Sequence, residues 1–289
     1  MAIIAVSREL AALGDETARE LAKLSGYHFV DKHTLEKRIK SCGIEDHKFQ
    51  KYDERKPSFF ASLSQGRDDY LHYLKTAIFA EAEQGSCVFI GRGAGMVFKD
   101  MPGLISVFLA SPLDIRIERV KSYFHCDERR ARQIIERSDQ DRVGFHRYFF
   151  DIEWRDPANY HLSLNTGVFR PSDCAEIINQ FKDHFFTIES EAQSAARLKE
   201  LILEQKVKHC IIYEREIPIH FLEVSVSDSI LTLYGVANSQ ALVDAALDAV
   251  SEMLNKTTGK TDGKTDGKAA DKPTVQSEIQ VVREYSVIP

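Results

Sequence analysis

Three stretches of the chain combine residue types that could hold a phosphate group. In the first, Ser7-Arg8-Glu9 follows an apolar run and precedes Gly14. The second is Gly91-Arg92-Gly93, directly after the apolar run 87–90. Backbone N–H groups of glycine-containing turns and guanidinium groups are the donors that proteins use for phosphate. The third stretch, residues 126–156, carries these arginines among many acids: Arg129, Arg130, Arg132, Arg137, Arg142, Arg147 and Arg155.

The first stretch departs from a working phosphate-binding loop. Such a loop needs several glycines, so that its N–H groups can wrap the phosphate, and a lysine that neutralises the β and γ phosphates. Residues 7–17 keep only Gly14 and contain no lysine. Asp15 and Glu16 suit the positive end of the following helix but would repel a triphosphate. On these residues alone, a plain helix start is favoured over a phosphate cradle.

The other chemistry-bearing residues indicate no separate site. An arginine-rich run on helices is usually a solvated face with ion pairs, and residues 126–156 allow that interpretation. The ten histidines form no H-x-x-x-H pair, and the five cysteines lie far apart, so no metal ligand set is predicted. Scattered thiols in odd number are typical of a protein in a reducing compartment.

Length and composition limit the possible classes of protein. The 289 residues exceed the ~150 of a typical domain, which favours two domains. No stretch approaches the ~20 apolar residues of a membrane span, and Met1 to Ser7 is predicted to be a first strand and not a signal peptide. We therefore expect a cytoplasmic protein. A net charge of −6 gives no reason to expect nucleic acid as a partner.

Strands and helices alternate over the first two thirds of the chain. Helical patterns separate the apolar runs; one helix follows Gly14 and ends at Gly26, and another opens at Pro112. Alternation of this kind predicts an α/β fold, a parallel sheet with helices on both faces. The five expected strands cover residues 2–6, 27–30, 87–90, 104–110 and 161–165.

Four blocks of residues, in order along the chain, resemble the cytidylate-kinase-like family. None is specific alone, but together they cover about residues 1–190. The resemblance implies a P-loop nucleoside monophosphate kinase fold for this part. The blocks are Ile4 to Leu10, Gly26 to Lys32, Val88 to Pro112, and Asp139 to Arg142 with Asn159 to Thr166.

The resemblance also implies an activity and a site. The expected reaction moves a phosphoryl group from ATP, with Mg²⁺, to a nucleoside monophosphate such as CMP or dCMP, and arginines from a closing lid gather round that group. Ser7, Arg8 and Gly14 would flank the donor phosphates. Arg92 would hold the acceptor phosphate, and Asp139 with Arg142 would act from the lid.

Departures from the family pattern leave a second interpretation open. Relatives usually have Gly-Ser-Gly-Gly where this chain has Ala11 to Gly14, so Leu13 puts a branched side chain where phosphate should lie. Cytidylate kinases proper carry a lysine after the loop and an acid in place of Gly93, and Ile90 stands where many kinases keep a metal-organising acid. Losing such charge stabilisation typically costs a factor of about a hundred per group. The alternative is a catalytically inactive nucleotide sensor or scaffold.

The last third, residues 192–289, resembles a BON domain, a small module of helix, strands, helix and strand. The resemblance rests on Val224 to Asn238, which predicts a hairpin, and on the alanine-rich helix after it. A Thr-Asp-Gly-Lys repeat predicts a flexible loop at 255–273. The resemblance implies a phospholipid or protein partner, while an oligomerisation or regulatory module is an equal alternative. The oligomeric state stays open.

Overall fold

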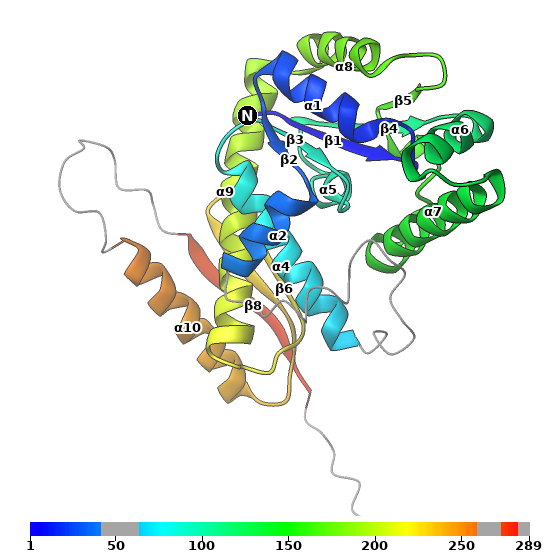
Figure 1. Cartoon of the computed structure of the whole chain (residues 1–289). Coiled ribbons are helices and arrows are strands. Elements are labelled where there is room, and N and C mark those ends of the chain that lie inside the picture. Colours follow the sequence, from blue (N-terminus) through cyan, green and yellow to red (C-terminus); the bar gives the residue numbers. More distant parts are fainter. Residues whose placement is uncertain (42–63, 259–272, 283–289) are drawn as a thin grey trace, which may run out of the picture. The chain divides into compact units, whose positions relative to one another are not determined.

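The protein, described by a computed structural model, forms two compact units (Figure 1). The structure describes residues 1–41, 64–258 and 273–282. The first unit covers Met1–Ala196 and the second Arg197–Pro289.

A parallel sheet forms the centre of the first unit, as the sequence predicts. Its order in the described residues is β2-β3-β1-β4-β5, and every adjacent pair is parallel. Buried apolar residues fill β3 and the first four positions of β1, which is typical of a sheet covered on both faces. The strands are β1 (Ile3–Arg8), β2 (His28–Val30), β3 (Cys87–Ile90), β4 (Leu104–Ala110) and β5 (Leu162–Asn165).

Helices cover both faces of this sheet (Figure 1). On one face α1 packs beside α8, and on the other α5 lies against β1 and β4. The predicted glycine cap of α1 is confirmed, because Gly26 has a φ of 72° and its N–H bonds to Ala22. The helices are α1 (Gly14–Ser25), α2 (Lys32–Ser41), α4 (Ser64–Ala82), α5 (Ala94–Val97), α6 (Leu113–Phe124), α7 (Glu128–Phe150), α8 (Pro171–Phe185) and α9 (Ile188–His209).

Alternate residues of the strands build the core under α1 and α8. Ile4 and Val6 of β1 lie with Leu21 of α1 and Ile178 of α8 in one buried cluster. Burying one such side chain completely contributes about 1.5–3 kcal/mol. This packing fixes where β1 ends and α1 begins, and so fixes the loop between them.

The second unit is a three-stranded sheet backed by helices. In the order β6-β7-β8, β6 (His220–Ser227) pairs antiparallel with β7 (Ile230–Ala237), and β8 (Thr274–Val281) runs parallel to β7. The predicted hairpin is confirmed. Its turn residues Asp228 and Ser229 both have positive φ, at 50° and 62°, as a two-residue hairpin turn requires. The BON resemblance itself stays a prediction.

Some boundaries in the second part differ from those expected. The first helix of the module expected at residues 192–289 begins earlier, at Ile188, and Cys210–Glu214 continues it as a π-helical turn. Helix α10 (Gln240–Thr258) includes residues 255–258, which the sequence assigned to the flexible loop. The rest of that loop, apart from residue 273, lies outside the described residues. Among the described residues, no helix has the length and apolar content needed to cross a membrane.

One side-chain contact ties the start of β5 to β4. The Nδ1 atom of His161 lies 2.9 Å from the backbone N of Ser106 and 2.8 Å from its Oγ. The backbone N–H of Ser106 donates, so Nδ1 must be unprotonated. Burial accordingly lowers the pKa of His161.

A lowered histidine pKa makes stability depend on pH. The unfolded chain, with a histidine pKa of about 6.5, takes up a proton before the folded chain does, so stability falls as pH drops below about 6.5. His161→Asn keeps an acceptor near Ser106 but cannot titrate. Between pH 7 and pH 5.5 we expect the urea midpoint of the unmodified protein to fall further than that of the variant.

The control for this experiment is His125→Asn. His125 is exposed, and its φ of 50° is one that asparagine tolerates. This variant should keep the pH dependence of the unmodified protein. Equal decreases in the urea midpoint of the unmodified protein and of His161→Asn would contradict the prediction.

Candidate functional site

The loop between β1 and α1 keeps the backbone of a glycine turn without the glycines. Ala11 has a φ of 60° and Leu13 a φ of 51°, both in the left-handed region. For a residue with a side chain this conformation costs about 1–2 kcal/mol. These are two of the positions where the family resemblance expects glycine. The loop therefore has a phosphate-loop shape that other contacts must hold in place.

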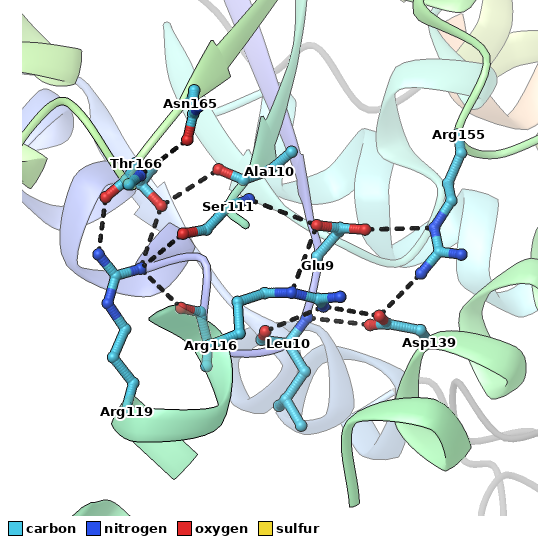
Figure 2. A network of polar contacts seen from close by, with 12 residues as sticks. Glu9, Leu10, Ala110, Ser111, Arg116, Arg119, Asp139, Arg155, Asn165 and Thr166 are labelled. Carbon is cyan, nitrogen blue, oxygen red and sulfur yellow. Dashed lines mark hydrogen bonds and ion pairs between the residues drawn. The ribbon is translucent and has the colours of Figure 1, made fainter. Parts of the chain in front are cut away.

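Arg119 of α6 supplies one set of those contacts (Figure 2). Its Nη1 donates to the carbonyl of Ala11 at 2.9 Å, and its Nη2 donates to the carbonyl of Thr166 at 2.6 Å. Nη1 also lies 3.3 Å from the Oγ of Ser111 and 3.3 Å from the Oγ1 of Thr166. Burial lowers the pKa of Arg119, yet a guanidinium stays charged in proteins. One cation thus joins the loop to the ends of β4 and β5.

A buried carboxylate from α7 binds the same loop. Asp139 is only 3% exposed. Its Oδ1 accepts the N–H of Leu10 at 3.0 Å. Its Oδ2 lies 2.7 Å from Nη1 of Arg116 and 2.8 Å from Nη2 of Arg155. A carboxylate so far from water requires such partners, because an unpaired buried charge costs several kcal/mol.

Glu9 adds a second carboxylate to the same two arginines. Its Oε1 lies 3.2 Å from Nε of Arg155, and its Oε2 lies 3.6 Å from Nε of Arg116. The N–H of Ser111 also donates to Oε2 at 3.4 Å. Figure 2 shows Glu9, Asp139, Arg116 and Arg155 converging on the loop. We call these four residues the arginine–carboxylate network.

The comparisons with known proteins identify the family of the first unit. The model of the cytidylate kinase-like family matches residues 3–168. The chain belongs to this family. The resemblance predicted from the four sequence blocks is thereby confirmed for this part of the chain.

This cytidylate kinase-like protein is similar to a curated protein and to solved structures. A cytidylate kinase of Sulfolobus acidocaldarius is 38% identical over 96 residues, which cover 33% of this chain and 52% of that protein. The chain thus spans about half the length of this curated relative. The crystal structure of an uncharacterized protein from Eubacterium ventriosum has a TM-score of 0.52 and 22% identity, over 63% of this chain and 99% of that chain. That likeness shows the fold alone.

A second solved structure is more distant. The shikimate kinase from Acinetobacter baumannii, in complex with shikimate, has a TM-score of 0.36 and 17% identity, over 63% of this chain and 92% of that chain. A likeness this weak supports no conclusion about this chain.

The structure places the donor-side residues predicted from the sequence beside the loop. The Ser7 hydroxyl, at the end of β1, hydrogen-bonds to the side chain of Tyr160. The Arg8 side chain lies over Gly14, and its Nε is 3.7 Å from Oδ2 of Asp15. These residues therefore flank the start of α1.

The remaining predicted residues divide between two places. Arg142 lies one turn from Asp139 on α7, with its Nη1 2.7 Å from Ser138 Oγ and 3.7 Å from Asp139 Oδ1. Arg92, only 1% exposed, projects toward α2 and α4. Its Nη2 is 3.2 Å from Oε1 of Glu36, and its Nη1 donates to the hydroxyl of Tyr70 at 3.3 Å.

Sequence reasoning did not single out Arg116 and Arg119. Both lie on α6, three residues apart, so they share one face of the helix. This helix follows β4 directly at the carboxyl end of the sheet, beside the β1–α1 loop. The spacing of these two arginines, shortly after Pro112, was the feature of the sequence that could have identified them.

A protein-held Mg²⁺ does not fit the residues present. Glu9 and Asp139, the two carboxylates of the arginine–carboxylate network, are both held by arginines. Ile90 lies 2% exposed within the apolar core. Over residues 1–41, 64–258 and 273–282, no group of three or more His, Cys, Asp or Glu could hold a metal ion. Any Mg²⁺ would have to arrive with the nucleotide.

Gly14 provides a test of how tightly the loop is packed. A methyl group on Gly14 would lie 2.4 Å from Cγ and 2.6 Å from Cβ of Arg8, which is closer than carbon atoms can approach. Gly14→Ala should therefore displace Arg8 and lower the free energy of unfolding by about 1–3 kcal/mol, the usual cost of overpacking. Urea unfolding followed by circular dichroism measures this change.

Gly95→Ala is the matched control. A methyl group there would meet Ala5 at 3.5 Å, an ordinary contact, and alanine favours helix α5. We expect this variant to be as stable as the unmodified protein or slightly more so. A Gly14→Ala variant of unchanged stability would show that Arg8 is not packed against the loop.

Proposed function

We propose that this protein binds a nucleotide at its β1–α1 loop and transfers a phosphoryl group from ATP to a nucleoside monophosphate of the CMP or dCMP type. The observation that carries the proposal is the loop itself, which keeps left-handed backbone at Ala11 and Leu13 and lies among converging arginines. A turn of this kind at a helix N-terminus binds anions through its N–H groups.

The position of the loop in the sheet supports the proposal. In open α/β sheets, ligands bind outside the carboxyl ends of the strands, where the strand order reverses. Here β1 has β3 on one side and β4 on the other, and the connection from β1 leads past β3 to β2. The order reverses beside β1, and the loop in question leaves its carboxyl end.

The charges of the region also support it. Phosphoryl transfer depends on positioning and on neutralising the charge of the transferred group. Five guanidinium groups and four carboxylates lie in or beside the loop, an excess of one positive charge. They belong to Arg8, Arg116, Arg119, Arg142 and Arg155, and to Glu9, Asp15, Glu16 and Asp139.

Each residue has a role under this proposal. Arg116 and Arg155 neutralise the transferred phosphoryl group, with Arg142 beside them, and Asp139 holds both arginines before nucleotide binds. Arg119 positions the loop. Arg92 binds the acceptor phosphate; its guanidinium is held by Glu36 and Tyr70, so it is already oriented before the acceptor arrives. Ser7, Arg8 and Gly14 border the donor phosphates.

A nucleotide sensor without catalysis is the second candidate. Two features favour it: Leu13 carries a branched side chain within the loop, and the core residue Ile90 stands where the family resemblance implies that many kinases keep a metal-organising acid. In this case nucleotide would bind without turnover. A lipid or protein partner of the second unit, implied by the BON resemblance, would then receive the signal.

Thermal unfolding with added ligand tests whether nucleotide binds at all. A ligand that binds only the folded protein stabilises it by RT ln(1 + [L]/Kd), about 2.7 kcal/mol at a hundredfold excess over Kd. We expect a higher Tm with Mg-ATP and with one nucleoside monophosphate from a panel that includes CMP and dCMP. No shift at millimolar nucleotide would contradict both candidates.

A pair of arginine variants locates the binding. Arg155→Met removes a contact to both network carboxylates and should reduce the Mg-ATP shift. Arg132→Met, which removes an arginine of similar exposure that pairs with Glu128 within α7, should leave the shift unchanged. Formation of ADP with the preferred monophosphate then separates a kinase from a sensor.

A further inference from the structure

The donors expected to bind phosphate are already bonded to a carboxylate. Asp139 accepts the N–H of Leu10 through one oxygen and pairs with Arg116 and Arg155 through the other. These three donors come from three parts of the chain, namely the β1–α1 loop, α6, and the segment after α7. Convergent N–H and guanidinium groups of this kind also bind a phosphate oxygen. The carboxylate thus satisfies a set of donors that suits a phosphate.

Because this ion pair is buried, phosphate cannot bind these donors while the Asp139 carboxylate does. Asp139 is 3% exposed and Arg116 is 5% exposed, so the contact between them excludes water. A phosphate that approached Leu10 and Arg116 would meet a negative charge at short range with little screening. Phosphate and the Asp139 carboxylate therefore compete for the same donors.

We propose that Asp139 is an internal anion of the β1–α1 loop and that it sets the affinity of the loop for nucleotide phosphates. The inference rests on the proposed function, because it assumes that phosphate binds at this loop. Binding of a nucleotide replaces the carboxylate on Leu10 and Arg116.

The surroundings of Asp139 allow this exchange. Arg142 lies on the same helix with its Nη1 3.7 Å from Oδ1 of Asp139, so the carboxylate keeps a cationic partner after it leaves Leu10. The Arg155 side chain is 47% exposed, so its guanidinium can move to pair with either the Asp139 carboxylate or a phosphate. Glu9 holds Arg116 more weakly than Asp139 does. Its Oε2 lies 3.6 Å from Nε of Arg116, while Oδ2 of Asp139 lies 2.7 Å from Nη1.

The direct test is Asp139→Asn. The amide oxygen can still accept the N–H of Leu10, but the negative charge is gone, so Arg116 and Arg155 become available to another anion. Isothermal titration with inorganic tripolyphosphate, in parallel with Mg-ATP, measures the affinities of the full chain. We expect tripolyphosphate to bind the variant about 10 to 100 times more tightly, the scale of one or two bonds to a charged group.

A charge-matched control separates this effect from a change in net charge. Asp173→Asn removes one negative charge from an exposed ion pair with Arg170 at the start of α8. It should bind tripolyphosphate like the unmodified protein. If Asp139→Asn does not fold, as judged by circular dichroism, Glu9→Gln takes its place, and a smaller increase in affinity is expected.

The outcomes distinguish this inference from the proposed function. Equal tripolyphosphate affinity of the variant and the unmodified protein, or weaker binding by the variant, would overturn the inference, and Mg-ATP binding by the unmodified protein would still support the function. Absence of tripolyphosphate binding in every variant would also overturn the inference. Binding of tripolyphosphate by Asp139→Asn but not by the unmodified protein would support the inference. It would show that the Asp139 carboxylate keeps phosphate out of the unmodified loop.

Discussion

A carboxylate that lies almost completely out of water must be balanced by cations and hydrogen-bond donors, and Asp139 imposes this constraint on the first unit. Its partners lie far apart in sequence, at Leu10, Arg116 and Arg155, so one ion-pair system joins the β1–α1 loop, α6 and the segment after α7. Breaking a buried pair by removing one partner costs about 3–5 kcal/mol. The arrangement of the proposed site therefore depends on this group.

The same constraint explains how a loop without its glycines keeps its shape. Left-handed backbone at Ala11 and Leu13 is unfavourable by itself. The bond from Arg119 to the Ala11 carbonyl and the bond from Leu10 to Asp139 hold the two sides of the turn. Contacts from side chains of α6 and α7 thus hold the turn in a conformation that glycine would adopt without them. The arginines that fix the loop are also the cations that a phosphate needs.

Much of the fold could be predicted because buried parallel strands are continuous apolar runs, and the strands at 87–90 and 104–110 were predicted with the boundaries observed. The site was harder, because ion pairs between different elements leave no local pattern: Arg116 and Asp139 are 23 positions apart, and Glu9 and Arg116 are more than a hundred apart. The sequence showed many arginines but not that Arg116 faces Asp139. Family resemblance suggested Arg92 for the acceptor phosphate, yet its pairing with Glu36 is visible only in the structure.

Amide hydrogen exchange of the full chain, with and without saturating Mg-ATP, tests most directly whether nucleotide phosphates bind at the β1–α1 loop. If they do, phosphate oxygens accept the N–H groups of this turn, and exchange should slow at residues 9–14 and at the start of α1. The second unit should be unaffected. Unchanged exchange at residues 9–14, or protection confined to another part of the chain while nucleotide is bound, would contradict the account.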